Sequence, residues 1–200
     1  GMNRILKIMG FVVAMGVITS TLLIGMDVLT SERITRNEEA LLQSKILDAF
    51  EIEYNTSNIY DTFTENVEKV ELTIDGVNVP VYRNPDTGSI SFEIEGGGVW
   101  GPIIGVLTLN EDLRTIENVG ILAQQETPGL GGRIVELPYL AKYEGVVFDP
   151  IVEVLKEGAS APNQVDAITG ATSTSSAFQT ILNDSYEQVI PAYQATLGGE

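Results

Sequence analysis

The first long pattern in the chain is an uninterrupted apolar run near the N-terminus. Residues 8–26 are 19 positions without a charge; Arg4 and Lys7 precede them and Asp27 follows. At about 1.5 Å of rise per helical residue, this run spans roughly 28 Å, close to the hydrocarbon thickness of a bilayer. The pattern predicts one membrane-spanning helix over residues 8–26.

A cleaved signal peptide is the alternative explanation of this run. Signal peptides have a shorter apolar region, about 7 to 15 residues, that ends in a small-x-small cleavage site. Residues 25–28 read Gly-Met-Asp-Val and offer no such site, so we expect an uncleaved, single-pass anchor in the cell (inner) membrane. The basic residues before the run favour a cytoplasmic N-terminus over residues 1–7, and either explanation exports the rest of the chain.

Helical spacing continues beyond the anchor. Between Thr35 and about Ile52, apolar residues recur on one side of a helix and charged residues on the others. We expect residues 27–55 to form a helical stalk. Residues 56–200 then form one extracytoplasmic domain, because no repeat, low-complexity linker or proline-rich boundary divides them.

The pattern next changes to alternation and to short apolar runs bounded by turn residues. Strands are predicted over residues 70–82, with a turn at Asp75-Gly76, and over residues 89–94, 103–109 and 116–123. Helical spacing returns at about residues 138–143 and from Ser175 onward. These elements predict an α+β fold, a twisted antiparallel sheet with packed helices, preceded by one N-terminal transmembrane helix.

Composition narrows the possible chemistry. The chain has no His and no Cys, which excludes disulfides, thiolate nucleophiles, iron-sulfur clusters, Ser-His-Asp triads and the common zinc sites. Flavin linkage through the ring to His or Cys is excluded as well. A carboxylate site for a hard cation stays open, but no pattern specifies one, so we predict no metal site.

The charge of the exported part points away from nucleic acid. After the apolar run the chain carries nine basic against 28 acidic residues, a net charge of −19. Such a surface repels nucleic acid, and no basic patch interrupts it. Most of these charges are explained by a solvated acidic exterior.

A hydroxyl-rich turn near the C-terminus is the strongest functional signal. From Asp166 to Ser175 the chain reads Asp-Ala-Ile-Thr-Gly-Ala-Thr-Ser-Thr-Ser, and helical spacing follows at once. Unpaired backbone N–H groups at a helix start favour a phosphate group near Thr172. An ordinary Ser/Thr helix cap is the alternative, although it leaves unexplained why Gly170 and Ala171 keep the space beside Thr172 free of bulk.

This turn resembles the flavinylation motif of the FMN-binding domain family, found in the G subunit of the Rnf complex and in the C subunit of the sodium-translocating NADH:quinone oxidoreductase. The shared pattern is Asp166-x-x-Thr169-Gly170-Ala171-Thr172. The resemblance implies that a separate flavin transferase joins FMN through its phosphate to Thr172, which needs no His or Cys in the acceptor. Ser173 and Thr174 are neighbouring hydroxyls from which Thr172 must be distinguished.

Two further strings support the resemblance. Residues 126–132, Glu-Thr-Pro-Gly-Leu-Gly-Gly, are similar to a loop of the same subunits, and residues 98–102, Gly-Val-Trp-Gly-Pro, are similar to their glycine-flanked aromatic turn. By themselves, Pro-Gly and Gly-Gly indicate only a tight loop, and a lone Trp in an apolar stretch is more often a core residue. The resemblance implies that the flavin ring lies against residues of both strings, namely Glu126, Thr127, Leu130, Gly131 and, as a weaker candidate, Trp100.

The function implied is electron transfer by the covalent FMN, with no catalytic side chain. The implied partners are other membrane subunits of an Rnf-type or Na+-NQR-type complex, the flavin transferase and the lipid bilayer. A charge at Glu126 near the ring is expected to disfavour an anionic reduced flavin. The short chain favours the Rnf G subunit, whereas residues 98–102 favour the C subunit of the quinone reductase, and on balance we slightly favour Rnf. A binding or sensor module without flavin, or a structural assembly subunit, remains the alternative.

Overall fold

The computed structural model describes residues 2–198 and divides into two units. The first unit ends at Ala40 and the second begins at Leu41, with helix α1 (Met2–Ala49) passing from one to the other. An 18-residue window of α1 has a mean hydropathy of 2.2, and none of it is buried. Helix α1 is therefore long and apolar enough to cross a membrane, as residues 8–26 predicted.

The folded second unit includes the last turns of α1. Ile46, Leu47 and Phe50 are buried against Tyr82 and Val106 of the sheet. The short helix α2 (Ile59–Asn66) contributes to the same apolar cluster. The folded unit thus begins inside the stretch that the sequence suggested as a stalk.

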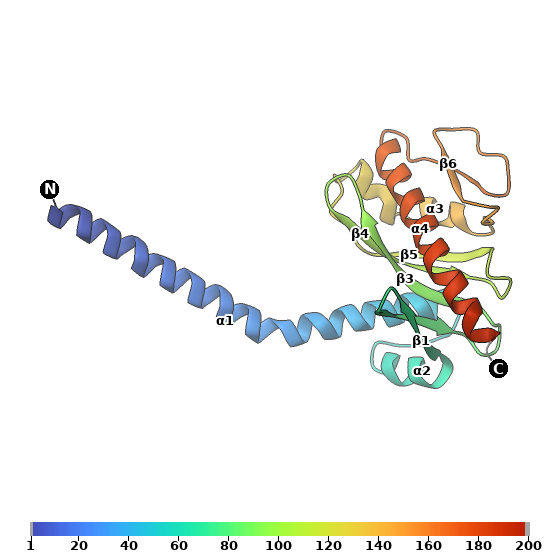
Figure 1. Cartoon of the computed structure of the whole chain (residues 1–200), viewed down its shortest axis with the longest axis horizontal. Helices are drawn as coiled ribbons and strands as arrows, with labels where there is room; N and C mark the ends of the chain where they lie inside the picture. The colour runs from blue at the N-terminus through green and yellow to red at the C-terminus, as the bar shows by residue number, and fades with distance from the viewer. Residues whose placement is uncertain (1, 199–200) are drawn as a thin grey trace. The chain divides into compact units, whose positions relative to one another are not determined.

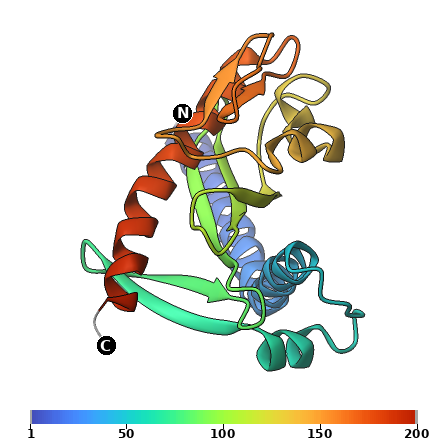
Figure 2. The same cartoon turned by 90° about the vertical axis from the view of Figure 1, so that its right-hand side faces the viewer.

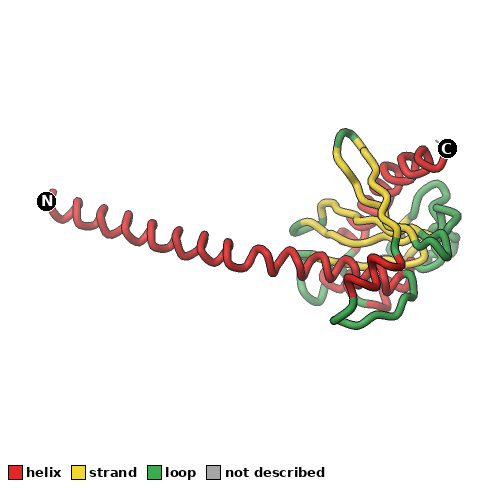
Figure 3. The backbone as a smooth tube through the Cα atoms, turned by 90° about the horizontal axis from the view of Figure 1, so that it is seen from below, coloured by secondary structure: helices red, strands yellow, loops and turns green. Residues whose placement is uncertain are grey.

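The centre of this unit is a five-stranded antiparallel sheet in the order β1-β2-β3-β4-β5 (Figures 1 and 3). The strands are β1 (Glu68–Ile74), β2 (Val77–Arg83), β3 (Ile90–Gly97), β4 (Pro102–Leu109) and β5 (Ile116–Ala123). Each strand pairs with the next along the chain, and Phe92 lies opposite Leu107 at the middle of the sheet. The predicted α+β class and the antiparallel sheet are confirmed.

The larger core lies between this sheet and helix α4 (Thr172–Leu197), which runs along the sheet in Figure 2. Phe178, Ile181 and Leu182 of α4 are almost fully buried there. Three short helices complete the core: η1 (Gly131–Val135), α3 (Leu137–Leu140) and η2 (Ala141–Tyr143). Their position fixes where the loop at residues 126–131 meets the start of α4.

The sequence did not indicate a second, two-stranded sheet. Strands β6 (Glu153–Leu155) and β7 (Gln164–Asp166) pair in parallel, and Leu155 lies opposite Asp166. This register places residue 156 beside the segment that leads into the hydroxyl-rich turn.

Candidate functional site

Helix α4 begins within the hydroxyl-rich turn, with Thr172 as its first residue. The capping position is Ala171, and no side chain forms a cap hydrogen bond there. The hydroxyls of Thr172 and Ser173 do not close the helix end, and both residues are exposed. The turn is therefore not an ordinary Ser/Thr cap. Instead, the exposed hydroxyl of Thr172 lies at the N-terminus of the helix.

The next two hydroxyls are committed to internal hydrogen bonds. Thr174 is buried and donates from Oγ1 to Oε2 of Glu126 at 2.5 Å. Ser175 accepts the N–H of Ile168 at 3.0 Å and donates to the carbonyl of Ala171 at 3.1 Å. Of the five consecutive hydroxyl residues 172–176, three are exposed, namely Thr172, Ser173 and Ser176, and of these only Thr172 and Ser173 line the cavity described below.

The carboxylate of Glu126 joins three segments of the site. It is 4% exposed, and its Oε1 accepts the backbone N–H groups of Val99 at 2.8 Å and Trp100 at 3.0 Å, while Oε2 accepts the Thr174 hydroxyl. Burial alone raises the pKa of Glu126, but these three hydrogen bonds outweigh it and leave the pKa below its ordinary value. Glu126 therefore holds the β3–β4 turn and the start of α4 together as an anion that accepts three hydrogen bonds.

Glycine is required at two positions around this junction. A Cβ on Gly131 would collide with Oγ1 of Thr174 and would lie 2.7 Å from Oε2 of Glu126. Gly170 has a φ of +84°, in the left-handed region that side chains rarely adopt. The first glycine lets the loop approach the carboxylate, and the second turns the chain into α4.

These segments surround a cavity of about 440 Å³. Its lining contains ten of the residues singled out from the sequence: Trp100, Glu126, Thr127, Leu130, Gly131, Gly170, Ala171, Thr172, Ser173 and Thr174. Thr169 instead lines a smaller cavity on the neighbouring side of the same segment. The three strings that are far apart in the chain thus meet at one site.

Trp100 does not belong to the core, contrary to what a lone tryptophan in an apolar stretch suggests. Its side chain is 71% exposed because its backbone N–H is bound to Glu126 at the tip of the β3–β4 turn, which turns the indole outward. Val99 and Leu130, each 49% exposed, line the same cavity. The rim of the site is therefore apolar and open.

Sequence reasoning missed two lining residues of the site, Val99 and Lys156, and of these two Lys156 carries a charge. It is the cation in the cavity lining within the described residues, and none of the ion pairs found there involves it. The β6–β7 register brings it next to the turn. A basic residue in a strongly acidic chain was the available signal, but its distance from Thr172 in sequence concealed it.

Comparison with known proteins supports a specific family. Residues 98–187, from the aromatic turn to the middle of α4, match the model of the FMN-binding domain. This segment contains the loop at 126–131, Lys156 and Thr172.

Two curated relatives of this chain bear the same name. The C subunit of the Na(+)-translocating NADH-quinone reductase from Pseudomonas aeruginosa is 33% identical over 100 residues, which cover 45% of this chain and 38% of that protein. Its namesake from Vibrio anguillarum is 25% identical over 167 residues, covering 69% and 66%. The chain thus matches between about two fifths and two thirds of the length of these relatives.

Solved structures agree in fold. The crystal structure of Shewanella oneidensis NqrC superposes with a TM-score of 0.71 at 18% identity, covering 80% of this chain and 97% of that chain. The C subunit of the Na(+)-translocating NADH-quinone reductase from Parabacteroides distasonis gives a TM-score of 0.65 at 22% identity, covering 84% and 96%. The sheet and the packing of α4 therefore follow a fold that is already known from these two structures.

The residues around the cavity suit FMN. Its volume lies in the range of about 300–1,000 Å³ that is typical of small-molecule sites. Apolar side chains at the rim offer contacts for a planar ring, while Lys156 and the N-terminus of α4 offer positive potential for a phosphate. Because Gly131 has no side chain, the loop can pack closely against Thr174 and Glu126 at the wall of the cavity.

Proposed function

We propose that this chain is the electron-transfer flavoprotein subunit of a membrane-bound, ion-translocating oxidoreductase, and that FMN is attached to Thr172 through its phosphate. One observation carries the proposal. Thr172 is exposed at the first residue of α4 and lines the same cavity as the 126–131 loop, whereas Thr174 is buried against Glu126. Only a hydroxyl at the cavity surface is open to a modifying enzyme.

The attachment is an ester-forming phosphoryl transfer. Oγ1 of Thr172 forms a bond to phosphorus and loses its proton, while the phosphorus releases the leaving group of an activated flavin donor of the phosphoanhydride class. We expect the transferase to supply the base, because the carboxylate that lines the cavity, Glu126, already accepts three hydrogen bonds and has a pKa below its ordinary value. This division of labour explains how a chain without His or Cys can carry a covalent flavin.

The first turn of α4 is the part of the chain that holds the phosphate. Its leading backbone N–H groups have no partners within the helix, and the helix dipole places positive potential at the same end. Lys156 adds a full positive charge to the cavity wall. These groups offset the negative charge of the phosphoester inside a strongly acidic chain.

The ring is held by packing. Bound FMN supplies the redox chemistry, and the protein supplies binding, orientation and electrostatics. Trp100, Val99 and Leu130 exclude water from the ring at the rim of the cavity, and Glu126 fixes the turn that carries the first two. No side chain of this site is needed as an acid or base for electron transfer.

The setting we propose is a membrane complex. The apolar stretch of α1 anchors the chain in the bilayer, with residues 1–7 in the cytoplasm and the FMN-binding domain outside it. The partners are the other membrane subunits of a complex of the Na+-NQR type, since both curated relatives bear that name. The preference for an Rnf G subunit, which rested on the short chain, stays without support from these relatives.

In-gel flavin fluorescence tests the attachment. The full chain is co-expressed with a flavin transferase, denatured and separated by electrophoresis. We expect a fluorescent band that disappears in Thr172→Ala and persists in Ser173→Ala, the matched control at the neighbouring exposed hydroxyl. A fluorescent Thr172→Ala band refutes the attachment site, and a dark wild-type band beside an active transferase favours a sensor or assembly module.

A further inference from the structure

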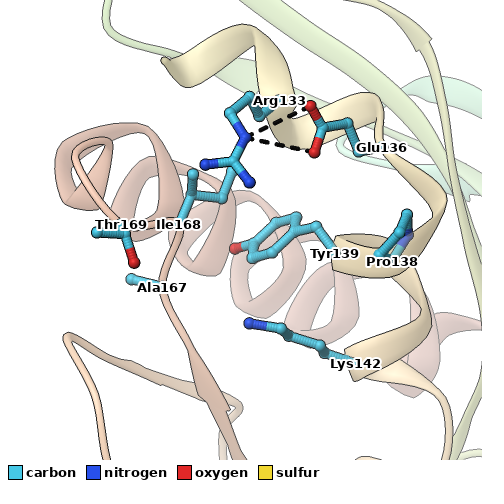
Figure 4. Close-up of a pocket in the computed structure, with 8 residues that line it drawn as sticks. All are labelled: Arg133, Glu136, Pro138, Tyr139, Lys142, Ala167, Ile168 and Thr169. Atoms are coloured by element: carbon cyan, nitrogen blue, oxygen red, sulfur yellow. Dashed lines mark hydrogen bonds and ion pairs between the residues drawn. The ribbon is translucent and has the colours of Figure 1, made fainter. Parts of the chain in front are cut away.

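A second, smaller cavity lies on the other side of the segment that leads into α4. Its volume is about 140 Å³, and Figure 4 shows its lining: Arg133, Glu136, Pro138, Tyr139, Lys142, Ala167, Ile168 and Thr169. The short helices η1, α3 and η2 form one wall, and residues 167–169 form the other. This cavity is too small for a flavin ring and does not share a lining residue with the larger one.

Two cations converge on this small cavity. The guanidinium of Arg133 uses Nε to contact the Glu136 carboxylate at 3.3 and 3.4 Å, and its two terminal nitrogens point away from Glu136 (Figure 4). Lys142 extends beneath the ring of Tyr139, with Nζ 5.7 Å from the ring centroid, and takes part in none of the ion pairs of the described residues. With one carboxylate against two cations, the cavity carries excess positive charge.

Neutral donors complete the wall. The hydroxyl of Tyr139 lies 2.8 Å from that of Tyr143, and the two phenols can share their protons in either direction. Burial raises the pKa of Tyr139 despite its hydrogen bonds, so the phenol stays protonated at neutral pH. When Tyr143 donates to Tyr139, the Tyr139 hydroxyl can donate to a ligand or to Ser175, with which it also forms a side-chain hydrogen bond. Thr169 presents its hydroxyl from the opposite wall (Figure 4).

We propose that this cavity binds a phosphate-type oxyanion. Arg133 offers the free ends of its guanidinium fork, and Lys142 offers a point charge, which together match the oxygens of a tetrahedral anion. The position of these cations is unusual for the chain, which has 11 basic against 28 acidic residues. Concentrating two of them around a cavity with a phenol and a hydroxyl creates local attraction where the whole chain repels anions.

The location gives the site a structural consequence. Residues 167–169 form the wall of the small cavity, and residues 170–174 line the larger one. A bound oxyanion would contact residues 167–169 and so stabilise the segment that precedes Thr172. The site does not depend on the flavin, so its test stands apart from the attachment at Thr172.

Isothermal titration of inorganic phosphate into the full chain in a neutral detergent tests the proposal, at fixed ionic strength with chloride as the background anion. We expect saturable one-site binding that weakens severalfold in Arg133→Gln and in Lys142→Met, and at least tenfold in the double variant. Arg83→Gln is the matched control. This partly exposed arginine pairs with Glu68 and acts on the pKa of Tyr193 near the far end of α4, roughly 30 Å from Thr172 at about 1.5 Å per residue.

Two further arms sharpen the outcome. Thr169→Val removes a donor without changing charge, and a severalfold loss of phosphate affinity there supports a built site. Glycerol 3-phosphate, a soluble analogue of a lipid headgroup, distinguishes two possible ligands. If it binds as tightly as inorganic phosphate, the site accepts a phosphate monoester; if it does not bind, the ligand is the free phosphate ion. Heats that are unchanged in the double variant, or that acetate reproduces equally, overturn the proposal.

Discussion

Oγ1 of Thr174 lies 2.5 Å from Oε2 of Glu126, across 48 positions of sequence. This contact joins the loop after β5 to the first turn of α4, and the same carboxylate holds the backbone of Val99 and Trp100. The arrangement assigns Glu126 a bracing role in the site. This role is additional to the predicted effect of the Glu126 charge on the flavin, which stays a prediction.

Removing the carboxylate should destabilise the domain. Glu126→Ala leaves two backbone N–H groups and one buried hydroxyl without their acceptor, and we expect a loss of about 2–4 kcal/mol in the free energy of unfolding. Glu126→Gln retains one carbonyl oxygen for the backbone donors and should cost about 1 kcal/mol. Denaturant unfolding of both variants measures the difference, and a loss below about 0.5 kcal/mol in Glu126→Ala contradicts the bracing role.

The Glu126 carboxylate should also make the free energy of unfolding decrease at acid pH. The pKa of Glu126 is lowered in the folded state, so the unfolded state binds its proton first as pH falls. Its stabilising contribution is present above the unfolded pKa, near about 4.3, and is lost as pH falls through the lower folded pKa. Unfolding free energies between about pH 6 and pH 2 should fall less steeply in Glu126→Gln than in wild type. Parallel slopes would count against the assignment.

The Glu93 carboxyl should affect the pH dependence of stability in the opposite direction. Burial and the neighbouring Glu95 raise its pKa, so the folded state binds the proton more tightly than the unfolded state. Stability is then lost as pH rises past the unfolded value. We expect Glu93→Gln to be more stable than wild type at about pH 7, with the gain vanishing below about pH 4. A variant that is less stable at neutral pH would show that another contact of Glu93 dominates.

Gly131 should tolerate no side chain. The added Cβ of Gly131→Ala meets both partners of the Glu126–Thr174 hydrogen bond, and we expect a cost of about 1–3 kcal/mol together with weaker flavin incorporation. Gly97→Ala is the matched control, because nothing lies within 4 Å of a Cβ at that position and its change should stay within about 0.5 kcal/mol. Equal effects at the two sites would argue against close packing at Gly131.

Lys156 should tune the flavin. A positive charge in the wall of the cavity favours the reduced, more electron-rich cofactor, so Lys156→Gln should lower the midpoint potential of the flavin by an amount on the order of tens of mV, consistent with about 1 kcal/mol between two unit charges roughly 4 Å apart in water. Spectroelectrochemistry of the flavinylated protein measures this shift. Lys69→Gln, in the outer strand β1, should leave the potential unchanged. An unchanged potential in Lys156→Gln places its charge away from the ring.

The sequence predicted most of the sheet because its strands are long and alternating and are bounded by turn residues. Asp75-Gly76 marks the β1–β2 turn, and residues 110–115 separate β4 from β5. Strands β6 and β7 contain three residues each, too few to show a period, so they were missed. Helix α2 was missed for a similar reason, since it is a single short element of eight residues.

The site was visible in sequence as motifs but not as contacts. The three strings could be recognised individually. However, the hydrogen bond to Glu126 that buries Thr174 and leaves Thr172 exposed depends on the packing of α4 against the sheet. The exposure of Trp100 likewise follows from a backbone bond to a residue 26 positions away. Lys156 reaches the cavity only through the β6–β7 register.

Peptide mass spectrometry tests the central claim most directly. No Lys or Arg follows Lys156, so trypsin releases residues 157–200 of the flavinylated protein as one peptide that contains every candidate hydroxyl of the turn. We predict that fragmentation places the mass of one FMN, less one water, on Thr172. Placement on Ser173 or Thr174, or an unmodified peptide from protein matured with an active transferase, would contradict the account.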